Sequence, residues 1–199
     1  LMCAVTGFYS VFLLEYGITI NQIGFIMALL NCLTVLLQII SGSLAGKPGG
    51  ISLRSAAVIM LGASGLMSLG LLLILGRSTA ALVGFYVASG VLTMSAQPLI
   101  TSIAMEHVNR GSPLSYGFAR GLGSAAYALC SLILGRLTAA FGTGLLPAVH
   151  LGVAALTITL VWRFKPPQRE APPETAEDTW AAAPEPEAVP QKDSLFAYI

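Results

Sequence analysis

Acidic residues are nearly missing from the first 163 positions of this sequence, where only Glu15 and Glu106 occur. Charged residues of both signs make up 10% of the chain, against about 25% in a typical soluble domain. The remaining acids all follow residue 163. A chain so poor in charge is typical of a polytopic membrane protein, and only its acidic end has the composition of a soluble segment.

Motifs for catalysis and metal binding are also missing. The chain has no His-Glu-x-x-His, no Gly-x-Ser-x-Gly and no phosphate-binding loop, so we expect neither an enzyme nor a bound cofactor. Cys3, Cys32 and Cys130 lie in apolar runs without metal-ligand spacing, so we expect small hydrophobes and no metal site. No basic patch carries interleaved aromatics, which argues against nucleic acid as a partner.

The chain does contain a series of long apolar runs separated by turn residues. A membrane-spanning helix needs about 20 mostly apolar residues. The pattern therefore predicts an all-α membrane protein with six transmembrane helices, over residues 1–17, 20–45, 54–76, 79–107, 113–139 and 145–163. The first run is shorter than a full span and has neither a basic flank nor an initiator methionine. We therefore expect a truncated first helix there rather than a signal peptide.

The composition changes after the expected bundle of residues 1–163. Residues 164–193 are rich in proline, alanine and glutamate and have almost no apolar periodicity, which predicts a disordered acidic linker. Residues 194–199 turn apolar again and indicate the start of a possible seventh helix.

Basic residues are distributed unevenly between the two ends of the expected bundle. In a six-span chain, loops 2–3 and 4–5 share a side with the tail, and together they carry Lys47, Arg54, Arg110, Arg163, Lys165 and Arg169. The opposite loops carry only Arg77 and Arg136. The positive-inside rule places the richer side, and with it the linker, in the cytoplasm. We expect a multi-pass protein of the cell (inner) membrane.

One arginine, Arg120, lies within residues 116–130 of the fifth apolar run. At helical spacing, Arg120, Ser124 and Tyr127 fall on one face. A full charge within a membrane helix is costly, and by default it marks a ligand or ion pathway. The alternative is a snorkelling arginine, because Arg120 lies only about seven residues, roughly 10 Å, past Pro113. We favour the pathway because the polar face continues inward past the arginine.

Two other runs have polar faces at helical spacing, formed by Asn31, Thr34, Gln38 and Ser41 and by Ser89, Thr93, Gln97 and Thr101. Such residues face protein or a cavity, and hydrogen bonding between helices is as plausible for them as a pore lining. Pro98 should kink its helix and free a backbone carbonyl. Residues 54–76 have no such face, and we expect Ser68 and its neighbouring glycines to serve packing only. We expect His150 to be a hydrogen-bonded packing residue.

Several segments resemble transporters of the major facilitator superfamily. Residues 8–24, with Leu36-Leu37-Gln38 and Gly42-Ser43-Leu44-Ala45, resemble helices 1 and 2 of its lactose-permease-like branch of oligosaccharide/proton and nucleoside/proton symporters. Residues 106–130 resemble the helix 4–5 region. The resemblance implies that the chain is the N-terminal six-helix half of such a transporter, which would work with a C-terminal six-helix half that is missing here.

The resemblance also implies roles for individual residues. Arg120 falls where lactose permease has its substrate-binding arginine, and Tyr127 falls where it has the tryptophan that stacks on the sugar ring. Ser124 falls on the small residue between them, and Gln38 falls on a helix-2 glutamine. The expected substrate-binding set is Arg120, Tyr127, Ser124, Gln38, Asn31 and Gln97.

The sequence departs from the family pattern at two places. The carboxylate that partners the arginine should fall near Thr101 and Ser102, where no acid occurs. Arg120 therefore binds an anionic group of the substrate directly or finds its partner in the other half. Gly46 stands where the loop 2–3 motif has an aspartate, so the salt bridge of that motif is not expected.

These observations predict secondary active transport of a small polar solute, of the sugar or nucleoside class, coupled to protons. The expected partners are the lipid bilayer, the solute, protons and the missing half. Two alternatives stay open. One is an exporter of drugs or metabolites, which would prefer a more apolar cavity, and the other is an inactive or accessory membrane protein fragment.

Overall fold

The computed structural model describes residues 3–45, 50–109 and 116–163. The loop glycine at position 46, the expected linker of residues 164–193 and the possible helix start at 194–199 lie outside these ranges. Every element of the described residues is helical, apart from an isolated bridge between Ala45 and Ile51. The expectation of an all-α protein is confirmed for this part of the chain.

The helices follow the apolar runs closely. They are the π-helical turn η1 (Cys3–Gly7), α1 (Tyr9–Glu15), α2 (Ile20–Leu44), α3 (Leu53–Ile74), α4 (Thr79–Asn109), α5 (Tyr116–Phe141), the 3-10 turn η2 (Thr143–Leu145) and α6 (Leu146–Arg163). Five are long and apolar enough to cross a membrane: α2, α3, α4, α5 and α6, the last together with η2. Five of the six expected membrane helices are therefore present, each within a few residues of its expected bounds.

The first run differs from the expected continuous helix. It forms the five-residue π turn η1 and the seven-residue helix α1, with Phe8 between them. Gly7 lies where the two pieces meet, and a Cβ there would come within 2.9 Å of the Tyr127 hydroxyl on α5. Glycine both weakens the helix and permits this close approach. The two short pieces do not make a full membrane span in the described residues.

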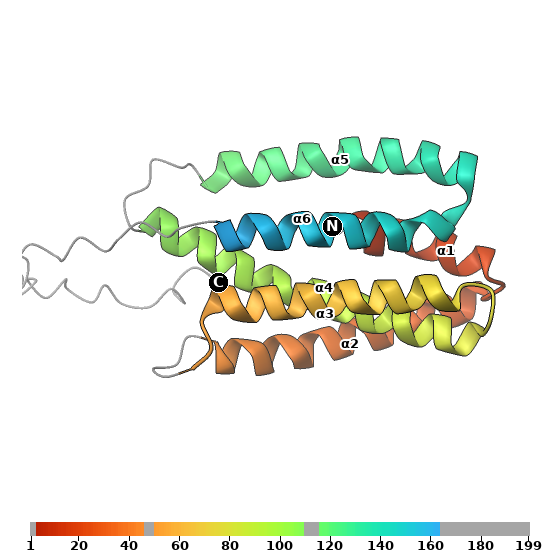
Figure 1. Ribbon diagram of the computed structural model, residues 1–199, viewed down its shortest axis with the longest axis horizontal. Coiled ribbons are helices and arrows are strands. Elements are labelled where there is room, and N and C mark those ends of the chain that lie inside the picture. Colours follow the sequence, from red (N-terminus) through yellow and green to blue (C-terminus); the bar gives the residue numbers. More distant parts are fainter. Residues whose placement is uncertain (1–2, 46–49, 110–115, 164–199) are drawn as a thin grey trace, which may run out of the picture. The chain divides into compact units, whose positions relative to one another are not determined.

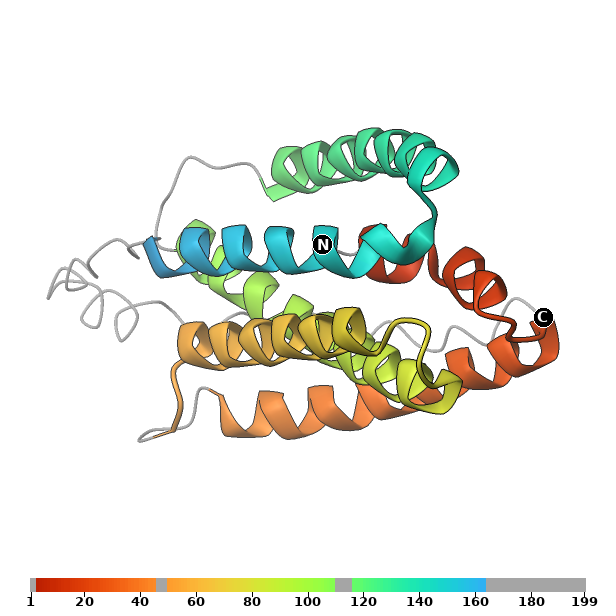
Figure 2. The ribbon, with the colours of Figure 1, turned by 45° about the vertical axis from the view of Figure 1, so that its right-hand side comes forward.

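The long helices alternate in direction along the bundle (Figures 1 and 2). The end of α2, the start of α3, the end of α4, the start of α5 and the end of α6 lie together at one end. This arrangement is the one that the loop assignment from the sequence assumed. Helix α3 packs against both α4 and α6, and α4 also packs against α2. Gly70 permits the α3–α4 contact, because a Cβ there would meet the Phe85 ring at 2.5 Å.

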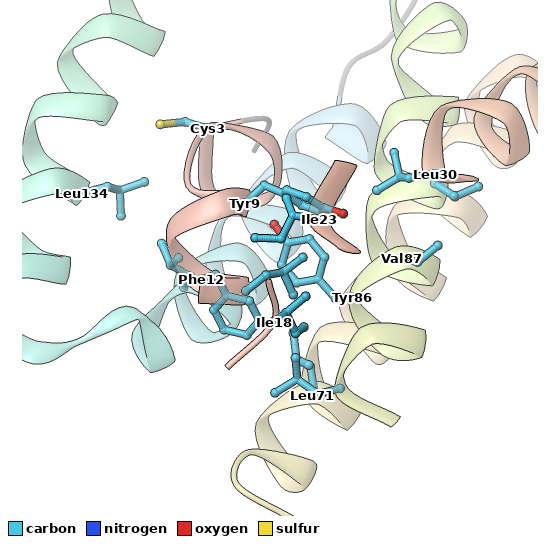
Figure 3. Packing of buried hydrophobic residues seen from close by; sticks show 14 residues of the cluster. Cys3, Tyr9, Phe12, Ile18, Ile23, Leu30, Leu71, Tyr86, Val87 and Leu134 are labelled. Carbon is cyan, nitrogen blue, oxygen red and sulfur yellow. The ribbon is translucent and has the colours of Figure 1, made fainter. Parts of the chain in front are cut away.

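Helix α1 is short but deeply anchored. Its Phe12 and Leu13 have no exposed surface, and the Phe12 and Tyr86 rings stack with centroids 5.1 Å apart. Tyr9 also packs on Tyr86, with ring centroids 5.1 Å apart (Figure 3). Aromatic pairs at such distances add about 0.5–1.5 kcal/mol each beyond their buried area. The aromatic contacts therefore fix the N-terminal segment to α4.

Glu15 connects the end of α1 to the turn between α5 and α6. Its Oε2 accepts a hydrogen bond of 3.0 Å from the backbone N–H of Thr143, the first residue of η2. Gly142 makes the turn with a φ of 79°, a conformation that favours glycine. A carboxylate at the positive end of a helix is stabilising. This contact gives a structural role to one of the two acids among the first 163 residues.

Candidate functional site

An exposed polar face lies on α5, one of the membrane-length helices. Within the most apolar 18-residue stretch of this helix, only 6% is buried in the bundle. Arg120, Ser124 and Tyr127 are all exposed. The Ser124 hydroxyl donates to the backbone carbonyl of Arg120 at 3.3 Å. A guanidinium in the hydrocarbon region is unfavourable unless protein, water or a ligand surrounds it. This face of α5 is therefore suited to border a polar cavity rather than lipid.

The polar face of α5, formed by Arg120, Ser124 and Tyr127, contacts the N-terminal segment η1 at its Tyr127 end. The Tyr127 hydroxyl lies against Gly7, and the Ser131 hydroxyl and the Cys3 thiol form a hydrogen bond of 3.1 Å. Figure 3 shows Cys3 directed toward the α5 ribbon. Cys3 is buried, as expected of a small hydrophobe, but it also pairs with a polar group. These contacts position Tyr127 without burying its ring.

The amide of Gln38 is used between helices. Its Nε2 donates to the backbone carbonyl of Met94 at 3.2 Å. Met94 lies four residues before Pro98, which has no N–H to offer that carbonyl. The sequence predicted that Pro98 frees a carbonyl, and the structure places the Gln38 side chain on it. Gln38 thus holds α2 to the interrupted turn of α4.

Replacing Gln38 by leucine is expected to lower the free energy of unfolding by about 1–3 kcal/mol, because the Met94 carbonyl loses its donor. Asn31→Leu is the matched control on the same helix. Asn31 is exposed, and its Nδ2 donates to the carbonyl of Met27 of its own helix at 2.8 Å. Thermal unfolding in detergent measures both variants. Equal losses of stability in the two would contradict the assignment of Gln38 to the α2–α4 contact.

The polar row of α4 does not keep to one side of the helix. Ser89 and Thr93 are buried, whereas Gln97 is exposed. Each step of four residues turns the row by about 40°, because a helix has 3.6 residues per turn. Thr101 donates to the carbonyl of Gln97 at 3.1 Å. The four residues therefore divide between a packed end and an open end.

Three of the six expected site residues make side-chain hydrogen bonds that do not join them to one another. Those of Asn31, Gln38 and Ser124 all go to backbone carbonyls. Arg120, Ser124 and Tyr127 share α5, Gln97 is exposed on α4, and Asn31 is exposed on α2. The α5 group is the part of the set that lies together on one element.

A buried polar cluster links α3, α4 and α6, and the sequence pattern did not reveal it. Its hydroxyls are close to one another: Ser64 lies 2.6 Å from Thr93, and Ser68 lies 2.9 Å from Ser89. Nε2 of His150 lies 3.0 Å from the Ser64 hydroxyl. His150 is thus a hydrogen-bonded packing residue, as expected. The expectation of packing only is wrong for Ser68, whose hydroxyl bonds to Ser89, whereas Gly70 does permit close packing of α3 on α4. The four-residue spacing of Ser64 and Ser68 was the available signal.

Comparison with known proteins gives one family. The family model described as "MFS_1 like family" matches residues 1–196. Among curated proteins and among solved structures, nothing matches.

Proposed function

Because this chain belongs to the MFS_1 like family of major facilitator transporters, we propose that it serves secondary active transport of a small polar solute of the sugar or nucleoside class, coupled to protons. Members of this family are transporters rather than enzymes. The proposal goes further than the family in naming the solute class and the coupling ion. The solute class is inferred from the side chains exposed on α5: Arg120, Ser124 and Tyr127.

The α5 face combines the groups that suit a polyol. A guanidinium presents five N–H donors to hydroxyl oxygens, and an aromatic ring covers the apolar face of a sugar. Arg120, Ser124 and Tyr127 are exposed on a mostly apolar helix. We assign substrate contact first to these three residues. Asn31 and Gln97, both exposed, extend the proposed site onto α2 and α4, and Gln38 adjoins it while it bonds to Met94.

We further propose that the chain forms half of the transporter. In this superfamily, two six-helix bundles rock against each other around a site near the membrane midplane. The slight burial of α5 supports a second bundle facing it. We assign the end of the bundle that carries Arg54 and Arg163 to the cytoplasmic side of the inner membrane, because the basic residues of the sequence gather at that end.

The test is uptake of a panel of sugars and nucleosides into proteoliposomes that contain the full-length gene product. An inward proton gradient should drive saturable uptake of at least one member, and a protonophore should abolish it. Uptake that ignores the proton gradient would overturn the coupling. Transport only outward, or only of apolar compounds, would favour an exporter. Absence of transport in both directions would favour the alternative of an inactive or accessory membrane protein.

A further inference from the structure

His150 is one of the most deeply buried polar residues of the described chain, with 1% of its surface exposed. Its Nε2 lies 3.0 Å from the Ser64 hydroxyl and 3.4 Å from the Thr93 hydroxyl. Its Nδ1 is buried as well, and it has no hydrogen-bond partner among the described residues. A buried ring nitrogen without a partner costs about 1–3 kcal/mol. The site therefore calls for a further hydrogen-bonding group.

The hydroxyl protons of the cluster determine what that group must do. Thr93 donates its proton to the carbonyl of Ser89 at 2.8 Å. The proton of Ser64 then serves the 2.6 Å contact with Thr93 or the carbonyl of Ser89 at 3.1 Å. Ser64 has none left for His150, so Nε2 carries the hydrogen and donates to Ser64. Nδ1 is then a lone-pair acceptor, and it needs a donor.

A small cavity lies beside the ring. Its volume is about 10 Å³, and its wall includes His150 with Ser68 of α3 and Ser89 of α4. This is close to the smallest volume that holds one water. Leu71 and Leu146 close the apolar side. The cavity thus combines room for one small molecule with several polar partners.

We propose that this cavity is a binding site for a single water molecule, which donates to Nδ1 of His150 and bonds to the hydroxyls of Ser68 and Ser89. The water joins α6 to α3 and α4 and completes the buried cluster. A neutral ligand fits better than a cation, because α3 and α6 contain no acid and Glu106 of α4 is exposed. This site is independent of the solute proposed above.

The test is NMR of the full-length protein labelled with ¹⁵N-histidine in lipid nanodiscs, with His107→Gln used to assign the His150 signals. We expect Nε2 protonated, Nδ1 unprotonated and a cross-peak between the ring and a slowly exchanging water. Nδ1 bonded directly to a protein group, or no water cross-peak, would overturn the proposal.

Ser68→Thr supplies a second, local check. The added methyl group fills the cavity while the hydroxyl is kept, so the water cross-peak should disappear. The matched control is Ser102→Thr on the exposed surface of α4, which should leave the cross-peak unchanged. Persistence of the cross-peak in Ser68→Thr would show that the water lies elsewhere. Because the unmodified chain is measured first, the result does not depend on the variant folding well.

Discussion

Arg120→Ala is expected to lower saturable uptake of the transported solute about 100-fold, with unchanged expression in the membrane. Arg120 is exposed on α5, and a guanidinium can give two parallel charge-assisted hydrogen bonds. Losing such a contact costs about 3 kcal/mol, which is about 100-fold in affinity. Initial uptake rates over a range of solute concentrations measure the effect.

Two variants separate substrate binding from a structural role of this arginine. Arg120→Lys keeps the charge but loses the planar pair of donors, so it should retain only part of the uptake. Arg136→Ala removes the other arginine of α5, which is also exposed, and should transport normally. If Arg120→Ala transports as well as the unmodified protein, Arg120 is a snorkelling residue near the helix end, and the proposed site is wrong.

His150→Leu is expected to lower the free energy of unfolding by about 3 kcal/mol. The substitution removes the donor to the Ser64 hydroxyl and the neighbour of Thr93, while all of these groups stay buried. Leaving buried polar groups unpaired costs about 1–3 kcal/mol each. The substitution should weaken the contacts among three helices, because the cluster spans α3, α4 and α6. Denaturant unfolding in detergent measures it.

His150→Gln is the control for this experiment. Glutamine keeps an N–H donor in a side chain of moderate size, so it should recover part of the lost stability. His150 is buried against α3 and α4, whereas the proposed α5 contacts are exposed, so whatever protein remains folded should keep its affinity for solute. If leucine is tolerated without loss, the cluster contributes packing alone and its hydrogen bonds do not stabilise the bundle.

The helix positions could be predicted from the sequence because apolar runs and turn residues are local signals. Helix α2 begins at the expected Ile20, and α6 ends at the expected Arg163. Pro98 also gave a correct local result, a carbonyl without its helical donor. These features depend on residues close together in the chain, which is why composition and spacing were sufficient.

The contacts between helices could not be predicted in this way. Ser64 and Ser68 form no long polar face on α3, and their role depends on Ser89, Thr93 and His150 arriving from other helices. The close approach of Tyr127 to Gly7, next to the interruption at Phe8, likewise joins residues far apart in the chain. For the proposed site, spacing placed Arg120, Ser124 and Tyr127 on one helix, but it could not show that Gln38 bonds to Met94.

The hydrogen bond between Gln38 and the Met94 carbonyl makes positions 38 and 98 thermodynamically coupled. With Pro98→Ala, residue 98 regains an N–H that can serve the Met94 carbonyl within α4. The Met94 carbonyl would then no longer need Gln38 as a donor. Gln38→Leu would therefore lower the free energy of unfolding less in the Pro98→Ala background than in the unmodified protein. A double-mutant cycle should therefore be non-additive, although the two residues lie on different helices. The residue at position 98 therefore determines how much the side chain at position 38 contributes to the free energy of unfolding.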